Sequence, residues 1–465
     1  MNLIKTIYIR VFRHRGKYAC LCLFIVGSFF LLKTDCTAQQ ILADTERKMK
    51  TDGFWIGIHP CPDKIIMTGK EIVCLNAHIE NDLKLTRDIT QLPPSISGTE
   101  LASSLQALLD RYRKRRLFFR NGLPANAAFY ERIRINMNFE RILPQMPVQY
   151  GITTQMTNQR CLPTMENLHT KGLNFNLDML QDNSFDMGTP VAVVHASADG
   201  EWYYVIDKHN NGWVKADRVA LCDVNELKEF LSPVRFAVVI KAKVSVYLNA
   251  NLTKYCDYVR MGTRLPLYGN LGATVLQVGI PFRKADGRLS MGVGYIAASG
   301  VHEGYLLYTA RTIIERAFEL INTPYEWGGL NGEQDCSQFI QEIFATVGLA
   351  LPRNSFKQAQ TGILLDQFPG ETPNRVKVES LARKATGGIT LLYMKGHIML
   401  FLGTVDNCPY AIHNTCSYSE GKTLQGTRVQ IINNVAVTSL FWGKETQKGS
   451  YIERLLMVMA ICGPL

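Results

Sequence analysis

The sequence PYEWGGLNGEQDCS, residues 324–337, leads into an apolar run at helical spacing: Phe339, Ile340, Ile343 and Phe344. This pattern predicts a helix that begins at Cys336, just after a glycine-rich turn. In a first helical turn, unpaired N–H groups and the helix macrodipole favour a thiolate. The stretch therefore predicts a reactive thiol, although a lone cysteine more often packs as a small hydrophobe.

Two histidines follow on apolar, strand-like segments, His397 in GHIMLFLG (396–403) and His413 in YAIHN (410–414). The turn-like TVDNCP between them predicts a hairpin. If the hairpin loop holds an odd number of residues centred near Val405, the histidines lie opposite each other on one face. A cysteine attacks efficiently when a histidine takes its proton and a third polar group orients that histidine. Cys336, His397 and His413 supply these three roles.

These residues resemble the NlpC/P60 family of papain-like cysteine peptidases, which act in bacterial cell-wall metabolism. The resemblance implies that Cys336 is the nucleophile, His397 the general base and His413 the orienting residue. It also implies that Tyr325 helps the Cys336 N–H to stabilise the oxyanion. The matching motifs are Tyr325-x-Trp327-Gly328-Gly329, Asp335-Cys336-Ser337, Leu351-Pro352-Arg353-x-Ser355, Gly396-His397-Ile398 and the His413 strand.

Family members of this kind cleave the bond between γ-D-glutamate and a diamino acid in peptidoglycan stem peptides. The resemblance implies that Asp335 faces a cationic group, such as the free amine of an L-alanine end. Ser337, Arg353 and Ser355 would hold the glutamate carboxylate, which the planar fork of an arginine matches. Trp327 is expected in the same binding site, with a wall of the core as its alternative role.

The first residues predict export. Five cationic residues precede the apolar run 19–32, and small residues at 36–38 suit cleavage before Gln39. The apolar run is short for a spanning helix, although an uncleaved anchor in the inner membrane stays open. Residues 1–38 carry six Lys/Arg and one Asp, so their removal lowers the net charge by five, from +11 to +6. We expect a modestly basic protein of the periplasm or cell envelope, without a nucleic-acid partner.

The chain is expected to be multidomain, with two small all-β SH3-like barrels and a C-terminal α+β papain-like catalytic domain. The resemblance places Asp182 where the first barrel of some relatives closes one end of the cleft and selects peptides with a free amino end. A solvated loop carboxylate is the competing interpretation. The expected divisions are a signal peptide (1–38), a clip domain (39–147), a first barrel (148–232), a second barrel (233–307) and the peptidase domain (308–465).

The sequence also predicts individual elements. We expect helices over 100–116, 309–322 and from Cys336 to about 348, and strands over 389–393, 397–402, 410–413, 429–432 and 455–461.

Three alternatives to trimming of released stem peptides remain open. The enzyme would act on intact cross-linked wall, or catalyse acyl transfer with the same residues, or bind the wall through its barrels with a silent catalytic domain. A Cys-His-His mechanism needs no metal or organic cofactor, and we expect a monomer. The sequence does not distinguish diaminopimelate from lysine in the substrate.

Overall fold

The computed structural model describes residues 45–171, 177–423, 426–444 and 448–463, and the side chains of 417–431 are left aside. The expected signal peptide, residues 1–38, lies outside this part of the chain. Residues Arg47–Leu465 form one unit, within which all the contacts below are made. In the part that the structure describes, no helix is long and apolar enough to cross a membrane.

The N-terminal segment divides its side chains between two cores. Trp55 and Ile72 join a core with the C-terminal helices, whereas Leu105 and Tyr112 join a core with the first β-sheet. The segment thereby packs on both ends of the unit. Its elements are η1 (Arg47–Lys50), α3 (Asp52–Ile58), β1 (Ile65–Met67), α4 (Gly69–Ala77), η2 (His78–Asp82), η3 (Ile89–Gln91), β2 (Ser95–Ser97), α5 (Gly98–Arg113), β3 (Phe118–Phe119), α6 (Ala127–Asn136), η4 (Phe139–Arg141) and β4 (Gln145–Pro147).

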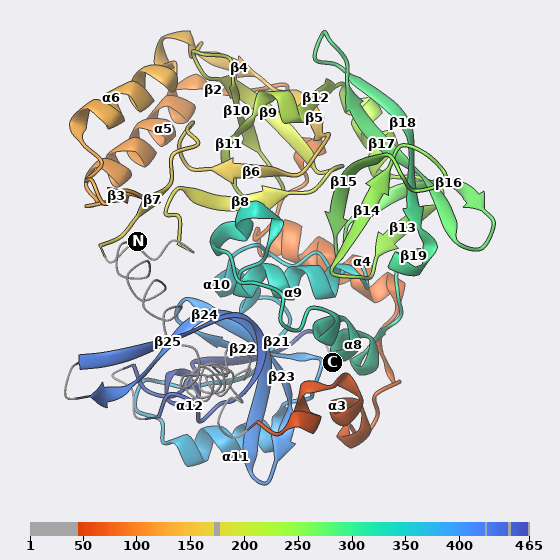
Figure 1. Cartoon of the computed structure of the whole chain (residues 1–465), viewed down its shortest axis with the longest axis vertical. Helices are drawn as coiled ribbons and strands as arrows, with labels where there is room; N and C mark the ends of the chain where they lie inside the picture. The colour runs from red at the N-terminus through yellow and green to blue at the C-terminus, as the bar shows by residue number, and fades with distance from the viewer. Residues whose placement is uncertain (1–44, 172–176, 424–425, 445–447, 464–465) are drawn as a thin grey trace, which may run out of the picture. The chain divides into compact units, whose positions relative to one another are not determined.

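The first seven-stranded sheet has the order β12-β5-β9-β10-β11-β6-β8, with antiparallel pairing throughout (Figure 1). Trp202 and Trp213 are buried on adjacent strands and anchor its core. Its elements, with those that follow it, are β5 (Gln149–Thr153), β6 (Thr157–Arg160), β7 (Leu168–His169), β8 (Gln181–Phe185), β9 (Pro190–Ala196), β10 (Trp202–Ile206), β11 (Asn211–Lys215), η5 (Ala216–Arg218), β12 (Val219–Cys222) and α7 (Val224–Leu231).

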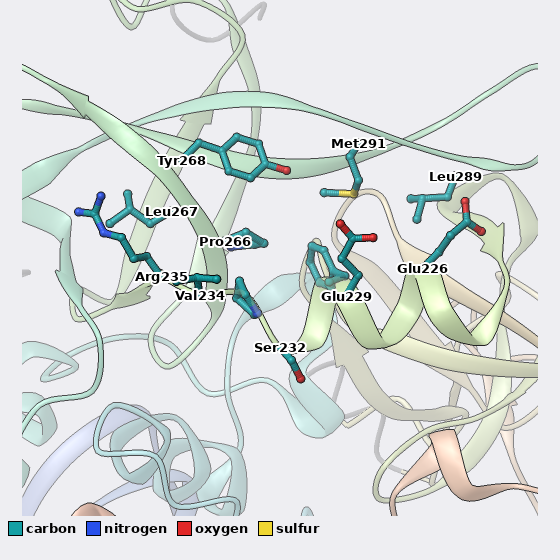
Figure 2. A pocket seen from close by; sticks show the side chains of 12 residues that line it. Glu226, Glu229, Ser232, Val234, Arg235, Pro266, Leu267, Tyr268, Leu289 and Met291 are labelled. Carbon is teal, nitrogen blue, oxygen red and sulfur yellow. The ribbon is translucent and has the colours of Figure 1, made fainter.

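The second seven-stranded sheet has the order β15-β14-β18-β17-β16-β13-β19 and its own core of valines, leucines and isoleucines. A cavity of about 530 Å³ lies between it and α7; Glu229 projects from α7 towards Met291, and Glu226 projects towards Leu289 (Figure 2). The elements are β13 (Phe236–Val239), β14 (Lys243–Tyr247), β15 (Tyr255–Arg260), β16 (Arg264–Leu271), β17 (Val275–Arg283), β18 (Leu289–Ala297), η6 (Ala298–Gly300) and β19 (Val301–Glu303).

The C-terminal part is an antiparallel six-stranded sheet, in the order β21-β26-β22-β23-β24-β25, with helices on both faces. Leu400 and Ile412 pack against α8 and α9, whereas Met399 and Phe401 pack with α11 and α12. The elements are β20 (Tyr308–Thr309), α8 (Ala310–Glu319), η7 (Trp327–Gly332), α9 (Cys336–Ala345), α10 (Ser355–Gln358), β21 (Ile363–Gln367), α11 (Asn374–Lys384), β22 (Thr390–Met394), β23 (His397–Val405), β24 (Cys408–Thr423), β25 (Gly426–Ser439), α12 (Tyr451–Arg454) and β26 (Met457–Ala460).

Most expected elements of the C-terminal part are confirmed, with shifted ends. Helix α8 stops at Glu319, and Asn322 adopts a left-handed conformation (φ 65°), so the helix expected to reach 322 is shorter. Strands β24 and β25 are much longer than expected. Strand β21 and helix α11 were not expected from the sequence. Helix α11 is mostly polar and buries few residues, so it carries a weak periodic signal.

Candidate active site

Cys336 is the first residue of α9, as the sequence predicts. Asp335 caps the helix: its carboxylate accepts hydrogen bonds from the N–H groups of Ser337 (3.1 Å) and Gln338 (3.0 Å). The apolar side of α9 is fully buried, with Phe339 and Ile340 in the shared core. This packing fixes the position of Cys336, which is itself 7% exposed.

The loop before α9 passes closely along strand β8. Gly328 and Gly329 have left-handed φ values of 63° and 69°. A Cβ atom at Gly329 would lie 2.3 Å from Oε1 of Gln338 and 2.5 Å from Oγ of Ser184. Glycine is therefore required at this position both by backbone conformation and by the approach of β8.

The histidine hairpin has a different turn from the one we expected. Strands β23 and β24 pair up to Val405 and Cys408, so the turn holds only Asp406 and Asn407. Both turn residues are left-handed, with φ of 49° and 61°, a conformation that Asp and Asn tolerate well. The expected odd-numbered loop is wrong.

A β-bulge nevertheless brings the histidines to one face. With a two-residue turn and regular pairing, His397 and His413 would lie on opposite faces of the sheet. The register shifts between Phe401 and Gly403, which adds one residue to β23 and reverses the facing of the residues before it. The two imidazoles therefore lie on the same face of the sheet. His413 is not directly opposite His397 but is displaced from it by two residues along the strands.

The two imidazoles form a hydrogen-bonded chain with a threonine. Nε2 of His397 lies 2.7 Å from Nδ1 of His413, and Nε2 of His413 lies 2.9 Å from Oγ1 of Thr438. Tyr451 of α12 packs beside both rings, with centroids 6.2 Å from His397 and 5.1 Å from His413. These contacts restrain the orientation of His397 and leave its Nδ1 for another partner.

The thiol and the imidazoles are held neutral. Burial raises the pKa of Cys336 to about 12, and the Asp335 carboxylate adds to the rise, while the N–H of Ile398 opposes it. Burial lowers the pKa of His397 to about 3, with a smaller contribution from Arg454. The expectation that the helix start favours the thiolate is therefore wrong for this structure, because burial dominates and Asp335 already accepts the first-turn N–H groups.

Helix α9 packs on β23 and β24, and Cys336 meets β23 at its first residues, where it is near the Ile398 N–H. Tyr325 is buried on the loop before α9. Its pKa is raised by burial and, next in size, by the Cys336 thiol, so its hydroxyl lies near the sulfur. Asn414 donates to the carbonyl oxygen of Gln334 (2.9 Å) and ties β24 to this loop.

Asp335 and Arg353 form a buried ion pair with two hydrogen bonds, of 2.8 and 2.6 Å. Arg353 also donates to Ser337 (2.8 Å), Asn183 (2.9 Å) and Gln338 (3.3 Å). All five N–H donors of the guanidinium are thereby used within the protein. A direct contact of Arg353 with a substrate carboxylate, or of Asp335 with an amine, would require this pair to open.

Asp182 lies on β8, beside the loop that precedes α9. Its carboxylate accepts a hydrogen bond from Asn210 (2.9 Å), and burial raises its pKa, with the Arg353 charge as the main opposing effect. Trp327 is 39% exposed, and Ser355 begins α10 in a half-buried position. The first sheet thus reaches the Cys336 region through β8.

Sequence reasoning missed Thr438, Asn183 and Asn414. Thr438 lies on a strand that the sequence predicted only in part, and nothing marks it among the other threonines of the chain. Asn414 directly follows His413, which was the available signal for it. In the described residues, His, Cys, Asp and Glu do not gather in any group of three or more that could hold a metal ion.

Two family models match this chain: residues 163–215 match an SH3 domain of the SH3b1 type, and residues 322–448 match the NlpC/P60 family. The molecule is thus a multidomain protein with a β-rich, SH3b-like region and a C-terminal α+β domain. The C-terminal α+β domain is an NlpC/P60 domain, and the β-rich region carries an SH3b domain.

Individual proteins are similar to this chain or to parts of it. The Bacillus subtilis (strain 168) gamma-D-glutamyl-L-lysine dipeptidyl-peptidase is 40% identical over 55 residues, which cover 12% of this chain and 19% of that protein. A solved NlpC/P60 endopeptidase from Photobacterium damselae subsp. piscicida superimposes with a TM-score of 0.69 at 18% identity, covering 87% of this chain and 96% of that one. An NlpC/P60 family protein from Bacillus cereus ATCC 10987 gives a TM-score of 0.45 at 19% identity, over 61% of this chain and 83% of that one.

Proposed function

We propose that this protein is a cysteine endopeptidase that hydrolyses the γ-D-glutamyl–diamino acid bond of peptidoglycan stem peptides. The observation that carries the proposal is the placement of Cys336 at the start of α9, which packs against strand β23. The first residue of β23, His397, is hydrogen-bonded to His413, and His413 is hydrogen-bonded to Thr438. The NlpC/P60 domain supports the peptidase class. The name of the B. subtilis relative supports the γ-D-glutamyl bond, over the short stretch that the two proteins share.

In the proposed reaction, Nδ1 of His397 takes the proton of the Cys336 thiol while the sulfur attacks the carbonyl carbon. For Nδ1 to accept this proton, His397 must carry its own hydrogen on Nε2 and donate it to His413, which in turn donates to Thr438. The carbon–nitrogen bond then breaks, the leaving amine takes the proton from His397, and a thioester remains on Cys336. Water, deprotonated by His397, hydrolyses the thioester and restores the thiol.

Tyr325 and the backbone N–H of Cys336 stabilise the negative charge that develops on the carbonyl oxygen. The buried hydroxyl of Tyr325 lies near the sulfur, and its raised pKa keeps it protonated as a donor. Donors fixed in advance around a developing oxyanion supply a large share of catalysis in acyl transfer. Removal of one such donor typically costs about 10²–10³ in kcat.

The first barrel closes one end of the cleft and selects peptides with a free N-terminal L-alanine. This part of the proposal is supported by hydrogen bonds between β8 and the catalytic region, from Gln181 to Gly328 (3.1 Å) and from Arg353 to Asn183 (2.9 Å). Asp182, beside them, receives the substrate ammonium. Trp327, Ser337 and Ser355 line the cleft, and the Asp335–Arg353 pair forms its polar wall.

The proposed division of the chain follows the sequence: a signal peptide (1–38), a clip domain (39–147), two SH3-like barrels (148–232 and 233–307) and a papain-like domain (308–465). The second seven-stranded sheet is the second barrel. The enzyme works as an exported monomer in the periplasm or cell envelope, on stem peptides, with no cofactor.

The proposal is tested by mass spectrometry of the products from L-Ala-γ-D-Glu-diaminopimelate, offered free and attached to muramic acid. We expect cleavage between glutamate and diaminopimelate in the free peptide and little cleavage of the attached form. Equal cleavage of both would favour a hydrolase of intact wall. A new amide in the presence of an added amine, without hydrolysis, would favour acyl transfer.

A further inference from the structure

A second cavity, of about 310 Å³, lies where both seven-stranded sheets meet helix α9. Gln338, Glu342 and Ala345 line it from the helix. These positions recur every three or four residues, so they share one side of α9, roughly 180° around the helix axis from Cys336. The cavity is therefore separate from the candidate active site.

Glu342 reaches this cavity with neither carboxyl oxygen hydrogen-bonded, although the residue is only 6% exposed. Its ion-pair neighbour is Arg260, with Nη1 3.6 Å from Oε1. The five N–H donors of Arg260 are already used by Asp186, Ser184 and the Glu333 carbonyl oxygen. Burying a carboxyl group without hydrogen bonds costs free energy. A bound group that donates a hydrogen bond to Glu342 would offset this cost.

His209 supplies the complementary group on the same cavity. The amide nitrogen of Gln341 donates to the Leu351 carbonyl oxygen (2.8 Å) and lies 3.3 Å from Nε2 of His209. Burial lowers the pKa of His209 to about 3, so the ring is neutral and, with Nε2 accepting, carries its hydrogen on Nδ1. That Nδ1 is buried and has no acceptor.

We propose that this cavity binds a small zwitterion, a free amino acid, with its ammonium group on Glu342 and its carboxylate on the Nδ1–H of His209. Asp186 and Asp207 line the cavity together with the buried guanidinium of Arg260 and the half-buried Lys208, so these charges balance. The negative charge that holds the ammonium group forms on Glu342 when its carboxyl gives up a proton. The volume is that of a small-molecule site at the lower end of the usual range. This inference does not depend on the proposed peptidase function.

Binding is measured by titration calorimetry with L-alanine as the probe and N-acetyl-L-alanine as the control that lacks the ammonium group. The full-length Cys336→Ala protein is compared with the same protein carrying Glu342→Gln or, as a matched control at an exposed carboxylate, Asp217→Asn. We expect L-alanine to bind, N-acetyl-L-alanine not to bind, and Glu342→Gln to weaken the binding at least about tenfold. The Asp217→Asn variant should bind as the parent does.

Thermal unfolding shows whether the Glu342→Gln protein is folded, and we expect a stability close to the parent's because Arg260 keeps its hydrogen bonds to Ser184 and Asp186. A second readout is proton release. Burial raises the pKa of Glu342 to about 8, so contact with an ammonium group should release about one proton at pH 7, detected in buffers of different ionisation enthalpy. No binding of L-alanine, or equal affinity in the Glu342→Gln protein, would overturn the proposal.

Discussion

The chain from His397 through His413 to Thr438 sets which nitrogen of His397 meets the thiol. Both ring nitrogens of His413 are hydrogen-bonded, at 2.7 Å to His397 and at 2.9 Å to Thr438. Thr438 therefore orients His413, which in turn orients His397. Thr438 is fully buried and touches no part of a substrate cleft in this account. It is a positioning residue.

Thr438→Val should lower kcat about tenfold with little change in KM, because the isosteric side chain removes the hydrogen bond and keeps the packing. Steady-state kinetics on the free tripeptide checks this. The matched control is Thr404→Val, on β23 and away from the imidazoles, which should leave kcat unchanged. An equal fall of kcat in both variants, or an unchanged kcat in the Thr438→Val protein, would contradict the positioning role.

Cys336 should behave as a protonated thiol in the free protein. With a pKa of about 12, its thiolate fraction rises about tenfold for each pH unit through the neutral and mildly alkaline range. We expect the rate of alkylation by iodoacetamide, followed by peptide mass spectrometry, to keep rising above pH 9, where a model thiol with an ordinary pKa levels off. A plateau that begins below pH 7 would show a thiolate–imidazolium pair instead.

Sequence patterns singled out Cys336, His397 and His413, whose elements pack together in the structure, but they did not predict protonation. Cys336, His397 and His413 each carry a local signal: a helix start or an apolar strand. The pKa of Cys336 depends on burial by the surrounding elements and on how Asp335 uses its oxygens, and neither can be read from the neighbouring residues. The role of Thr438 depends on strand register, which the sequence left open.

At the scale of elements, α9 is held by the Asp335–Arg353 pair at its start. Removing one partner of a buried ion pair leaves the other charge uncompensated. Arg353→Met should therefore lower the free energy of unfolding by roughly 3–5 kcal/mol. Urea denaturation provides the measurement.

The matched control for that variant is Arg375→Met on α11, which removes an exposed i,i+4 pair with Glu379. Such a pair contributes less than about 1 kcal/mol. If the two variants lose the same stability, the pair at Arg353 does not hold α9 in the way described here.

The hairpin shows why element-level prediction is incomplete. The sequence indicated two strands and a turn, and both strands exist. The relation between His397 and His413 depends on one extra residue in β23, and no local pattern announces a bulge in an apolar run such as this one. The same outcome, two imidazoles on one face, is reached by a different register.

At the scale of the whole molecule, β8 of the first sheet lies against the loop before Cys336. This contact joins segments about 150 residues apart, so sequence patterns do not reveal it, and the expected position of Asp182 came from the family resemblance alone. The N-terminal segment packs on two cores. The sequence did not indicate this arrangement, because the helices of the segment are short and lack a strong hydrophobic periodicity.

Asp182→Asn should raise KM for the free tripeptide about tenfold and leave kcat nearly unchanged, because it removes the charge that attracts the substrate ammonium. Selectivity for the free over the N-acetylated peptide should fall in parallel. Asp217→Asn, at an exposed carboxylate of the same sheet region, is the matched control and should change neither constant. Unaltered selectivity in the Asp182→Asn protein would remove Asp182 from the binding site.

The peptidase proposal is tested by comparing wild type, Cys336→Ala and His397→Ala on L-Ala-γ-D-Glu-diaminopimelate, with the products identified by mass spectrometry. We expect L-Ala-D-Glu and free diaminopimelate from the wild type alone, with both variants folded and inactive. Cleavage that persists without the Cys336 thiol, or cleavage at a different bond, would contradict it.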